Sequence, residues 1–156
     1  MARKLQIAVI GDNNPSPEVI QWAEEVGRVL AQKDAVVVCG GLGGVMAAVA
    51  RGANAVGGVT VGILPTYDIG TANASISIAI PSGMGHARNV VVVSAGDAVI
   101  ALPGSYGTLS EVALACKLGK SVVGLGAWAD IKGVQTAKTP DEAVTLALAA
   151  AHRLNG

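Results

Sequence analysis

Charged residues are scarce in this chain of 156 residues. Asp, Glu, Lys and Arg make up 14%, whereas about a quarter is usual for a soluble domain. Hydrophobic residues make up 51%, so the sequence is not of the disordered class. So little charge would leave apolar surface uncovered on an isolated small domain. We therefore expect a homo-oligomer, either a dimer or a tetramer.

An excess of positive charge and long apolar runs are also missing. The net charge is zero and no Lys/Arg cluster occurs, so we expect no nucleic-acid partner. The mean hydropathy is +0.53, but charges, prolines or glycine pairs interrupt each apolar run before it could span a bilayer, which predicts no membrane partner. The first residues lack a cleavable signal pattern and read as a strand, so a cytoplasmic location is expected.

Cysteine is rare too. Cys39 and Cys116 are isolated within apolar stretches, which predicts two buried thiols rather than a disulfide or a zinc site. We expect no metal site.

Apolar runs typical of buried strands alternate with helical patterns along the whole chain. Expected strands cover residues 4–11, 35–41, 59–65, 75–80, 97–102 and 121–128, with an edge strand at 132–137. Expected helices follow Ser16 and cover 43–58, 81–96, 108–120 and 139–154, where Ser16 caps the first and Thr139 with Glu142 has capping-box spacing in the last. The four valines at 90–93 suit a strand equally well, but a crossover helix is needed there. The pattern predicts one α/β domain over residues 1–156, with a doubly wound, mostly parallel Rossmann-like sheet and helices on both faces.

Three strand-to-helix turns are rich in glycine: Cys39–Met46, Pro81–Asn89 and Ala101–Glu111. In a parallel sheet such turns lie on the carboxyl edge, where free backbone N–H groups and positive helix ends favour an anion. Packing alone is the alternative for any single turn. No G-x-G-x-x-G follows the first strand and the P-loop motif G-x-x-x-x-G-K-S/T does not occur, which disfavours an ordinary NAD dehydrogenase or a kinase.

Two ionisable residues are expected at this edge. Arg88 lies at a helix start, where a cation is unfavourable unless an anion binds beside it. Its alternative is an exposed or structurally paired arginine. Glu111 could polarise water or stabilise oxocarbenium charge beside a bound sugar or heterocycle. Its alternative is a capping box with Thr108, which has the same T-x-x-E spacing.

Other polar residues are weaker candidates. Asp12, Asn13 and Asn14 follow the first strand and could bind ligand hydroxyls, although turn chemistry is their default role. His86 lies in the second glycine turn without an evident acid partner, and Tyr106 could stack on a ring or merely pack. His152 is expected on the surface near the end of the last helix. Ser105 has no general base in its motif, so no covalent nucleophile is proposed.

The stretches "CGGLGGVMAAVARGA", "GGVTVGILP", "GMGHARN" and "DAVIALPGSYGTLSEVALA" together resemble the Lonely Guy (LOG) and molybdenum-cofactor-carrier-like group of Rossmann proteins. Members are often labelled "possible lysine decarboxylase", but no pyridoxal-phosphate lysine context is visible here. The resemblance covers nearly the whole chain in order. It implies homo-oligomers and a glycine-threonine loop, here Gly104, Ser105, Gly107 and Thr108, that holds a phosphate.

The resemblance implies two activities. The Lonely Guy branch hydrolyses cytokinin nucleoside monophosphates to a free base and ribose phosphate, and its catalytic arginine and glutamate match Arg88 and Glu111. That branch usually has Gly at position 105 and Lys at position 89, where this chain has Ser105 and Asn89. "GMGHARN" is more similar to the carrier-like branch, which binds molybdenum cofactor (molybdopterin) as cargo without chemistry.

We therefore expect binding of a phosphorylated heterocycle, either molybdenum cofactor or a nucleotide, by a carrier or sensor. The alternatives are a phosphoribohydrolase with Arg88 and Glu111 as catalytic residues, and a structural scaffold that binds nothing. The expected ligand-binding residues are Gly11, Asp12, Gly40, Gly41, Gly43, Gly44, Met84, Gly85, Arg88, Asn89, Pro103, Gly104, Ser105, Tyr106, Gly107 and Thr108.

Overall fold

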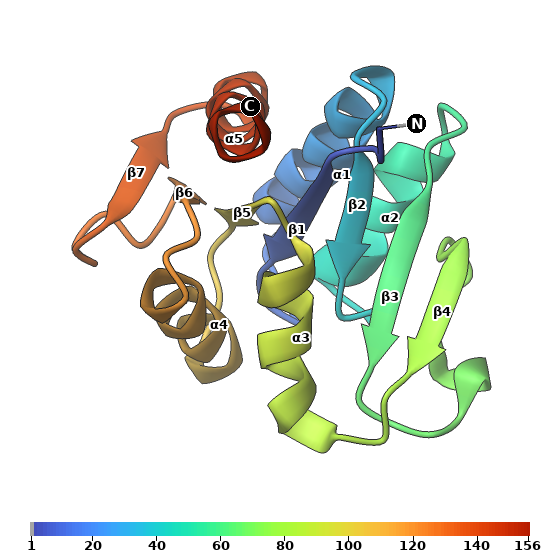
Figure 1. Cartoon of the computed structure of the whole chain (residues 1–156). Helices are drawn as coiled ribbons and strands as arrows, with labels where there is room; N and C mark the ends of the chain where they lie inside the picture. The colour runs from blue at the N-terminus through green and yellow to red at the C-terminus, as the bar shows by residue number, and fades with distance from the viewer. Residues whose placement is uncertain (1) are drawn as a thin grey trace.

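The computed structural model describes residues 2–156, which form one sheet with helices packed on it (Figure 1). The strands are β1 (Gln6–Ile10), β2 (Val36–Cys39), β3 (Thr60–Leu64), β4 (Ile78–Pro81), β5 (Ala98–Ala101), β6 (Val122–Leu125) and β7 (Val134–Ala137). The α-helices are α1 (Pro17–Gln32), α2 (Val45–Asn54), α3 (Arg88–Ala95), α4 (Tyr106–Lys117) and α5 (Pro140–Asn155). Two short 3-10 helices, η1 (Ile69–Thr71) and η2 (Gly85–Ala87), flank β4.

The seven strands pair in the order β4-β3-β2-β1-β5-β6-β7, and all of these pairs are parallel. In the centre, Ile7 of β1 is in register with Val37 of β2 on one side and with Ala98 of β5 on the other. The chain winds outward from this central strand in both directions, so the strand order reverses between β1 and β5. The predicted doubly wound parallel sheet is confirmed, and the predicted edge strand is β7.

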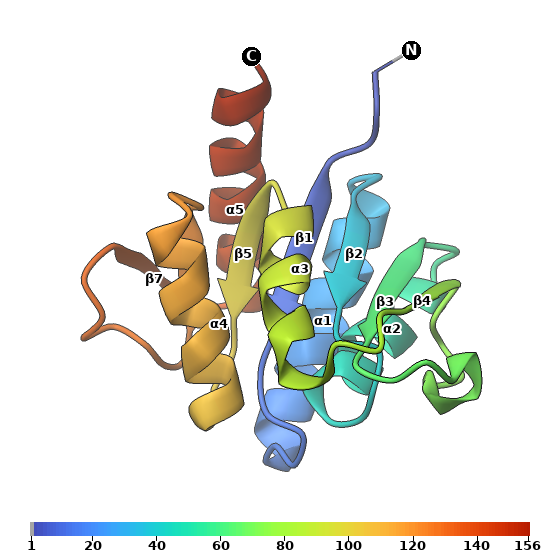
Figure 2. The same cartoon turned by 60° about the horizontal axis from the view of Figure 1, so that its bottom comes forward.

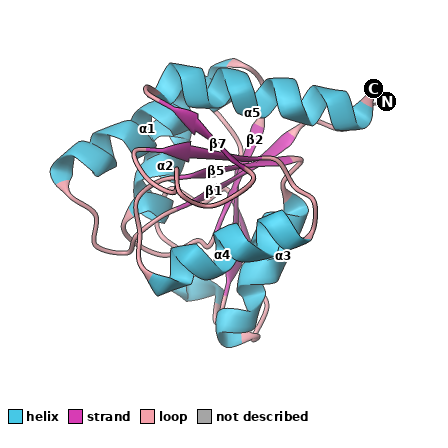
Figure 3. Ribbon diagram, turned by 90° about the vertical axis from the view of Figure 1, so that its left-hand side faces the viewer, coloured by secondary structure: helices cyan, strands magenta, loops and turns pink. Residues whose placement is uncertain are grey.

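Helices cover both faces of the sheet (Figure 3). Ile7 and Val9 of β1 pack into a core with α1, α2 and α5, whereas Ala8 and Ile10 pack into a second core with α3 and α4. Each of these four residues is at most 2% exposed. Because side chains of a strand alternate between the faces, burial on both sides explains why the strands are continuously apolar in sequence.

Hydrogen bonds between side chains and nearby backbone amides fix the starts of α1 and α5. The hydroxyl of Ser16 accepts a hydrogen bond from the Val19 amide at 3.3 Å, and that of Thr139 accepts one from the Glu142 amide at 3.2 Å. The reciprocal bond expected of the Glu142 carboxylate goes to the amide of Lys138, at 2.8 Å, rather than to that of Thr139. The ambiguous valine run is helical in α3, with Val92 and Val93 fully buried.

The two cysteines differ in burial. Cys39 is fully buried, and burial raises the pKa of its thiol to about 11. Cys116 packs against the second core from α4 but is only partly buried, so the prediction of two buried thiols is wrong for this residue. Across residues 2–156, no helix is long and apolar enough to cross a membrane, and no group of three or more His, Cys, Asp or Glu side chains is placed to hold a metal.

Candidate functional site

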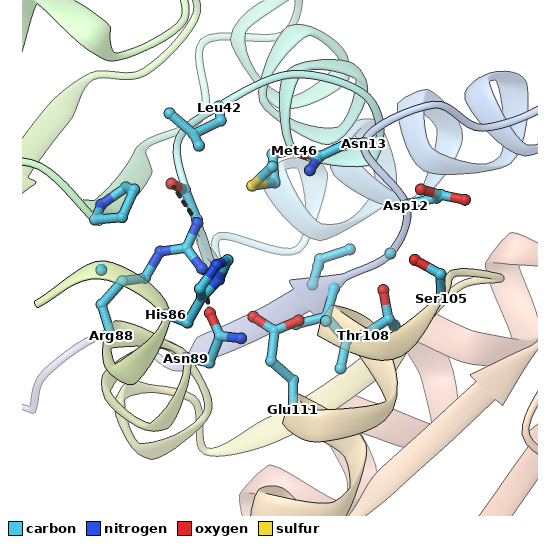
Figure 4. Close-up of a pocket in the computed structure, with 17 residues that line it drawn as sticks. Asp12, Asn13, Leu42, Met46, His86, Arg88, Asn89, Ser105, Thr108 and Glu111 are labelled. Carbon is cyan, nitrogen blue, oxygen red and sulfur yellow. Dashed lines mark hydrogen bonds between the residues drawn. The ribbon is translucent and has the colours of Figure 1, made fainter.

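A cavity of about 440 Å³ opens where the carboxyl ends of the central strands meet (Figure 4). Its walls come from the turns after β1, β2, β3 and β5, from η2, and from the first turns of α2, α3 and α4, because parallel strands bring all these connections to one edge (Figure 2). The lining residues are Val9, Ile10, Gly11, Asp12, Asn13, Gly40, Leu42, Met46, Pro65, Gly85, His86, Arg88, Asn89, Ser105, Gly107, Thr108 and Glu111. The cavity volume is typical of a site for a small organic ligand.

The N-terminus of α4 faces this cavity and lacks a side-chain cap. Ser105 occupies the N-cap position, but its side chain makes no capping hydrogen bond. The first bond within the helix runs from the Leu109 amide to the Ser105 carbonyl at 2.9 Å, so the amides of residues 106–108 have no intrahelical partner. Amides of this kind, at the positive end of a helix dipole, form a favourable position for a phosphate.

The carbonyl groups beside these amides are already occupied. The Leu102 carbonyl accepts a hydrogen bond from the indole of Trp128 at 2.9 Å, and the Pro103 carbonyl accepts one from the Asp12 amide at 3.1 Å. Trp128 has a φ of 70°, a backbone conformation rarely adopted by residues with a large side chain. These bonds fix the loop that leads into α4 and engage the carbonyls of that loop with protein donors.

The glycine turn before α2 differs from the expected ligand-binding loop. The Val45 amide at the start of α2 donates to the Asp12 carbonyl at 2.9 Å, so the β1 loop occupies this helix end. A Cβ on Gly44, whose φ is 62°, would lie 2.3 Å from the same Asp12 oxygen. Gly44 therefore permits two loops to pack together. Gly41 and Gly43 also lie outside the cavity lining, and only Gly40 of the four expected glycines lines it.

Arg88 is buried beside the cavity, at 8% exposure, rather than exposed. Its Nε donates to the Ile63 carbonyl at 2.9 Å and one terminal nitrogen donates to the Gly40 carbonyl at 3.4 Å, while the other donates to the side-chain oxygen of Asn89. These three bonds leave two of the five N–H groups of the guanidinium available. Burial lowers the pKa of Arg88, and the nearby charge of Glu111 opposes this effect.

Glu111 lies inside α4, and the capping-box alternative for it is wrong. Helix α4 begins at Tyr106, two residues earlier than expected, so Thr108 is an interior residue and Ser105 is the N-cap. The Glu111 side chain faces the cavity at 7% exposure, and its carboxylate accepts no hydrogen bond from residues 2–156. Burial raises its pKa to about 7, opposed by the charge of Arg88. It is therefore a carboxyl group that can exchange a proton near neutral pH.

Some of the weaker polar candidates line the cavity. Asp12 and Asn13 line it, and the Asp12 carboxylate also accepts a turn bond from the Asn14 amide at 3.2 Å. His86, a weaker candidate in the sequence, lies in the lining beside Arg88 (Figure 4).

Several expected binding residues lie outside the lining: Met84, Pro103, Gly104 and Tyr106. Tyr106 is 87% exposed, which contradicts the packing alternative. Gly104 has a steric role instead, because a Cβ there would lie 2.1 Å from the hydroxyl of buried Thr108. His152 is exposed in the last turn of α5, as predicted.

The structure adds lining residues that the sequence does not distinguish. Leu42 and Pro65 lie in the connections after β2 and β3, Met46 lies in the first turn of α2, and Val9 and Ile10 end β1. Their only sequence signal is an apolar side chain near a strand end, which core residues share.

A family model described as "SLOG cluster4 family" matches residues 4–153. Among curated proteins, an uncharacterized protein of Archaeoglobus fulgidus is 45% identical over 140 residues, covering 90% of this chain and 92% of that protein. A rice protein (Oryza sativa subsp. japonica) named "Probable cytokinin riboside 5'-monophosphate phosphoribohydrolase LOGL9" is 37% identical over 93 residues, which span 58% of this chain and 41% of the rice protein.

Two solved structures are similar over almost the full length. The molybdenum cofactor binding protein of Rippkaea orientalis is 34% identical with a TM-score of 0.91, covering 96% of this chain and 98% of that one. The molybdenum cofactor carrier protein of Chlamydomonas reinhardtii is 30% identical with a TM-score of 0.87, covering 95% of this chain and 98% of that one.

Proposed function

Because this chain belongs to the SLOG cluster4 family, within the group of Lonely Guy and molybdenum-cofactor-carrier-like proteins, we propose that it binds a phosphorylated heterocycle as a carrier or sensor. The ligand is molybdenum cofactor or a nucleotide. The observation that carries the proposal is the uncapped N-terminus of α4, whose free amides open into a cavity that also contains Arg88.

Each wall of the cavity has a role in this proposal. The amides of Gly107 and Thr108 and the hydroxyl of Ser105 bind the phosphate. The two free N–H groups of Arg88 supply positive charge on the opposite wall. Glu111 and Asp12 accept hydrogen bonds from N–H or O–H groups of the heterocycle or of a sugar attached to it, since both are acceptors facing the cavity.

Ligand-dependent stabilisation tests the proposal. We expect molybdopterin or a nucleoside monophosphate to raise the melting temperature of the protein, because a ligand at a hundredfold its dissociation constant adds about 2.7 kcal/mol of stability. Isothermal titration then gives the affinity. If pterins, nucleoside monophosphates and nucleotide sugars all leave the melting temperature unchanged, the scaffold alternative holds.

A second candidate function is hydrolysis of a nucleoside 5′-monophosphate to a free base and ribose 5-phosphate. It is favoured by the carboxyl group of Glu111, whose pKa of about 7 suits proton transfer, close to the charge of Arg88. In this reaction Glu111 assists the attack of water on the anomeric carbon, and Arg88 orients the substrate. Assays of base release distinguish the two functions: Glu111→Gln lowers turnover by orders of magnitude in a hydrolase but leaves most of the affinity of a carrier.

We also propose that the protein is a homo-oligomer. Large apolar side chains remain exposed on the edge strand β4 and near it, namely Ile78 (50%), Ile80 (45%) and Tyr67 (85%). Light scattering at micromolar concentration tests this expectation, and a monomeric mass would contradict it.

A further inference from the structure

Asn89 is a buried amide that contacts both walls of the cavity. It is 5% exposed and follows Arg88 at the start of α3. Its side-chain oxygen accepts a hydrogen bond from the Arg88 guanidinium, and its side-chain nitrogen donates to the hydroxyl of Ser110 on α4 at 3.1 Å. The Ser110 hydroxyl in turn donates to the Gly107 carbonyl at 2.6 Å.

The donors and acceptors in this series of hydrogen bonds allow only one orientation of the Asn89 side-chain amide. The Ser110 hydroxyl has a single proton, and the Gly107 carbonyl can only accept, so that proton is used there. The hydroxyl must then accept from its other neighbour, which places the NH₂ group of Asn89 toward Ser110. The carbonyl group of Asn89 consequently faces Arg88, which can only donate. A carboxylate at position 89 would lack the donor, and an apolar side chain would lack both functions.

The result is a continuous series of hydrogen bonds across the base of the cavity. It begins at the Ile63 carbonyl at the end of β3 and passes through Arg88, Asn89 and Ser110 to the Gly107 carbonyl in the first turn of α4. Arg88 and the α4 amides are the two groups to which the proposed function assigns the anion. Figure 4 shows the Asn89 amide between the Arg88 guanidinium and the α4 side of the cavity.

We propose that Asn89 is a positioning residue that holds the Arg88 guanidinium in a fixed relation to the first turn of α4. Through Ser110 it sets the separation between the cationic wall and the amide wall, and thereby the affinity for a phosphate. The effect on affinity rests on the proposed function. The effect on Arg88 does not, because it depends only on hydrogen bonds among residues of this chain.

Nitrogen-15 NMR of the arginine side chains tests the positioning directly. The Arg88 signals are assigned by their loss in Arg88→Lys. We expect resolved terminal N–H signals in the wild type, because three hydrogen bonds hinder rotation of this guanidinium. Ser110→Ala and Asn89→Leu should broaden or average these signals. Ser94→Ala is the matched control, since Ser94 is an exposed serine on α3 whose hydroxyl makes no hydrogen bond with residues 2–156. Ser110→Ala alters an exposed serine and is expected to fold.

Titration with inorganic phosphate completes the test. The loss of one hydrogen bond of about 1 kcal/mol corresponds to roughly fivefold weaker binding in Ser110→Ala, with Ser94→Ala equal to the wild type. Unchanged Arg88 signals in both Ser110→Ala and Asn89→Leu would overturn the positioning role. Altered Arg88 signals in a protein that binds neither inorganic phosphate nor a nucleoside monophosphate nor a pterin would support the positioning role and refute the proposed function instead.

Discussion

The guanidinium of Arg88 lies where a side chain at position 40 would project. A Cβ on Gly40 would be 2.6 Å from a terminal nitrogen of Arg88 and 2.5 Å from the sulfur of Met46. Atoms that are not bonded do not approach so closely in a packed interior. The absence of a side chain at Gly40 is therefore a condition for the position of Arg88 in the cavity.

Gly40→Ala should displace Arg88 and weaken both the fold and the site. We expect a loss of about 1–3 kcal/mol in the free energy of unfolding, as is usual for overpacking a buried position. Urea unfolding measures this loss, and calorimetry with a nucleoside monophosphate or molybdopterin measures the loss of affinity. Gly43→Ala is the stability control, because no atom lies within 4 Å of a Cβ there. Equal stability of the two variants would contradict the steric role of Gly40.

Glu111→Gln should change how stability depends on pH. The pKa of Glu111 in the fold is about 7, against an ordinary value of 4.5, so the folded state retains a proton that the unfolded state releases. Its favourable contribution is complete below pH 4.5 and is lost as the pH rises to 7. The difference corresponds to roughly 3 kcal/mol. Unfolding in urea at pH 4, 6 and 8 should show this decline in the wild type relative to the glutamine variant. Parallel profiles of the two proteins would contradict the raised pKa.

Asp97→Asn should destabilise the protein at neutral pH but not in strong acid. Arg3 donates two hydrogen bonds to the Asp97 carboxylate, at 2.8 and 2.6 Å, and the Gln6 amide donates a third at 2.9 Å. The Arg3 bonds are the main cause that lowers the pKa of Asp97 to about 2, from an ordinary 3.8. The stabilisation is present above pH 3.8 and is lost as the pH falls through 2.

Because Arg3 is largely exposed, we expect Asp97→Asn to lower the free energy of unfolding by only about 1–2 kcal/mol at pH 7. Asp34→Asn, which breaks the exposed ion pair of Asp34 with Lys4, should cost less than about 0.5 kcal/mol. Thermal unfolding at pH 7 and pH 2 compares the two variants. A cost for Asp97→Asn that is the same at both pH values would refute this linkage.

Gly107→Ala should raise the stability of the protein but weaken its binding of phosphate. Gly107 lies in the first turns of α4 and a Cβ there would meet no atom within 4 Å, so the change to Ala stabilises the helix by about 0.5–1 kcal/mol. The same methyl group would project from a residue that lines the cavity, and we expect weaker binding of phosphate. A higher melting temperature with unchanged phosphate affinity would show that the anion does not bind at this turn.

The sequence is sufficient to predict the sheet, its parallel direction and most helix boundaries. Each central strand is buried on both faces, and this burial requires the continuous apolar runs that identify strands such as β1 and β5. Ser16 and Thr139 cap their helices with their own side chains, which is a local interaction that a sequence pattern can reveal. Even the valine run of α3 follows from topology, since a parallel pair needs a crossover.

The site is predicted less completely, because its details depend on contacts between distant segments. Arg88 bonds to the carbonyl of Gly40, which follows β2, and to that of Ile63, near the end of β3, and no local pattern shows this. The glycines before α2 look like a phosphate loop, yet Gly44 accommodates the loop after β1. The T-x-x-E spacing of Thr108 and Glu111 imitates a capping box, although Ser105 begins the helix.

The hydrogen bond from the Trp128 indole to the Leu102 carbonyl makes Trp128 an intrinsic fluorescent probe of the loop before α4. The chain has two tryptophans, and Trp22 packs on Gly126 on the other side of the sheet from α4. In a Trp22→Phe variant, the emission of Trp128 alone would register any shift of the segment Leu102–Ser105, because the indole N–H is bonded directly to it. Occupation of the neighbouring pocket could then be followed by fluorescence, without attaching a dye to either molecule.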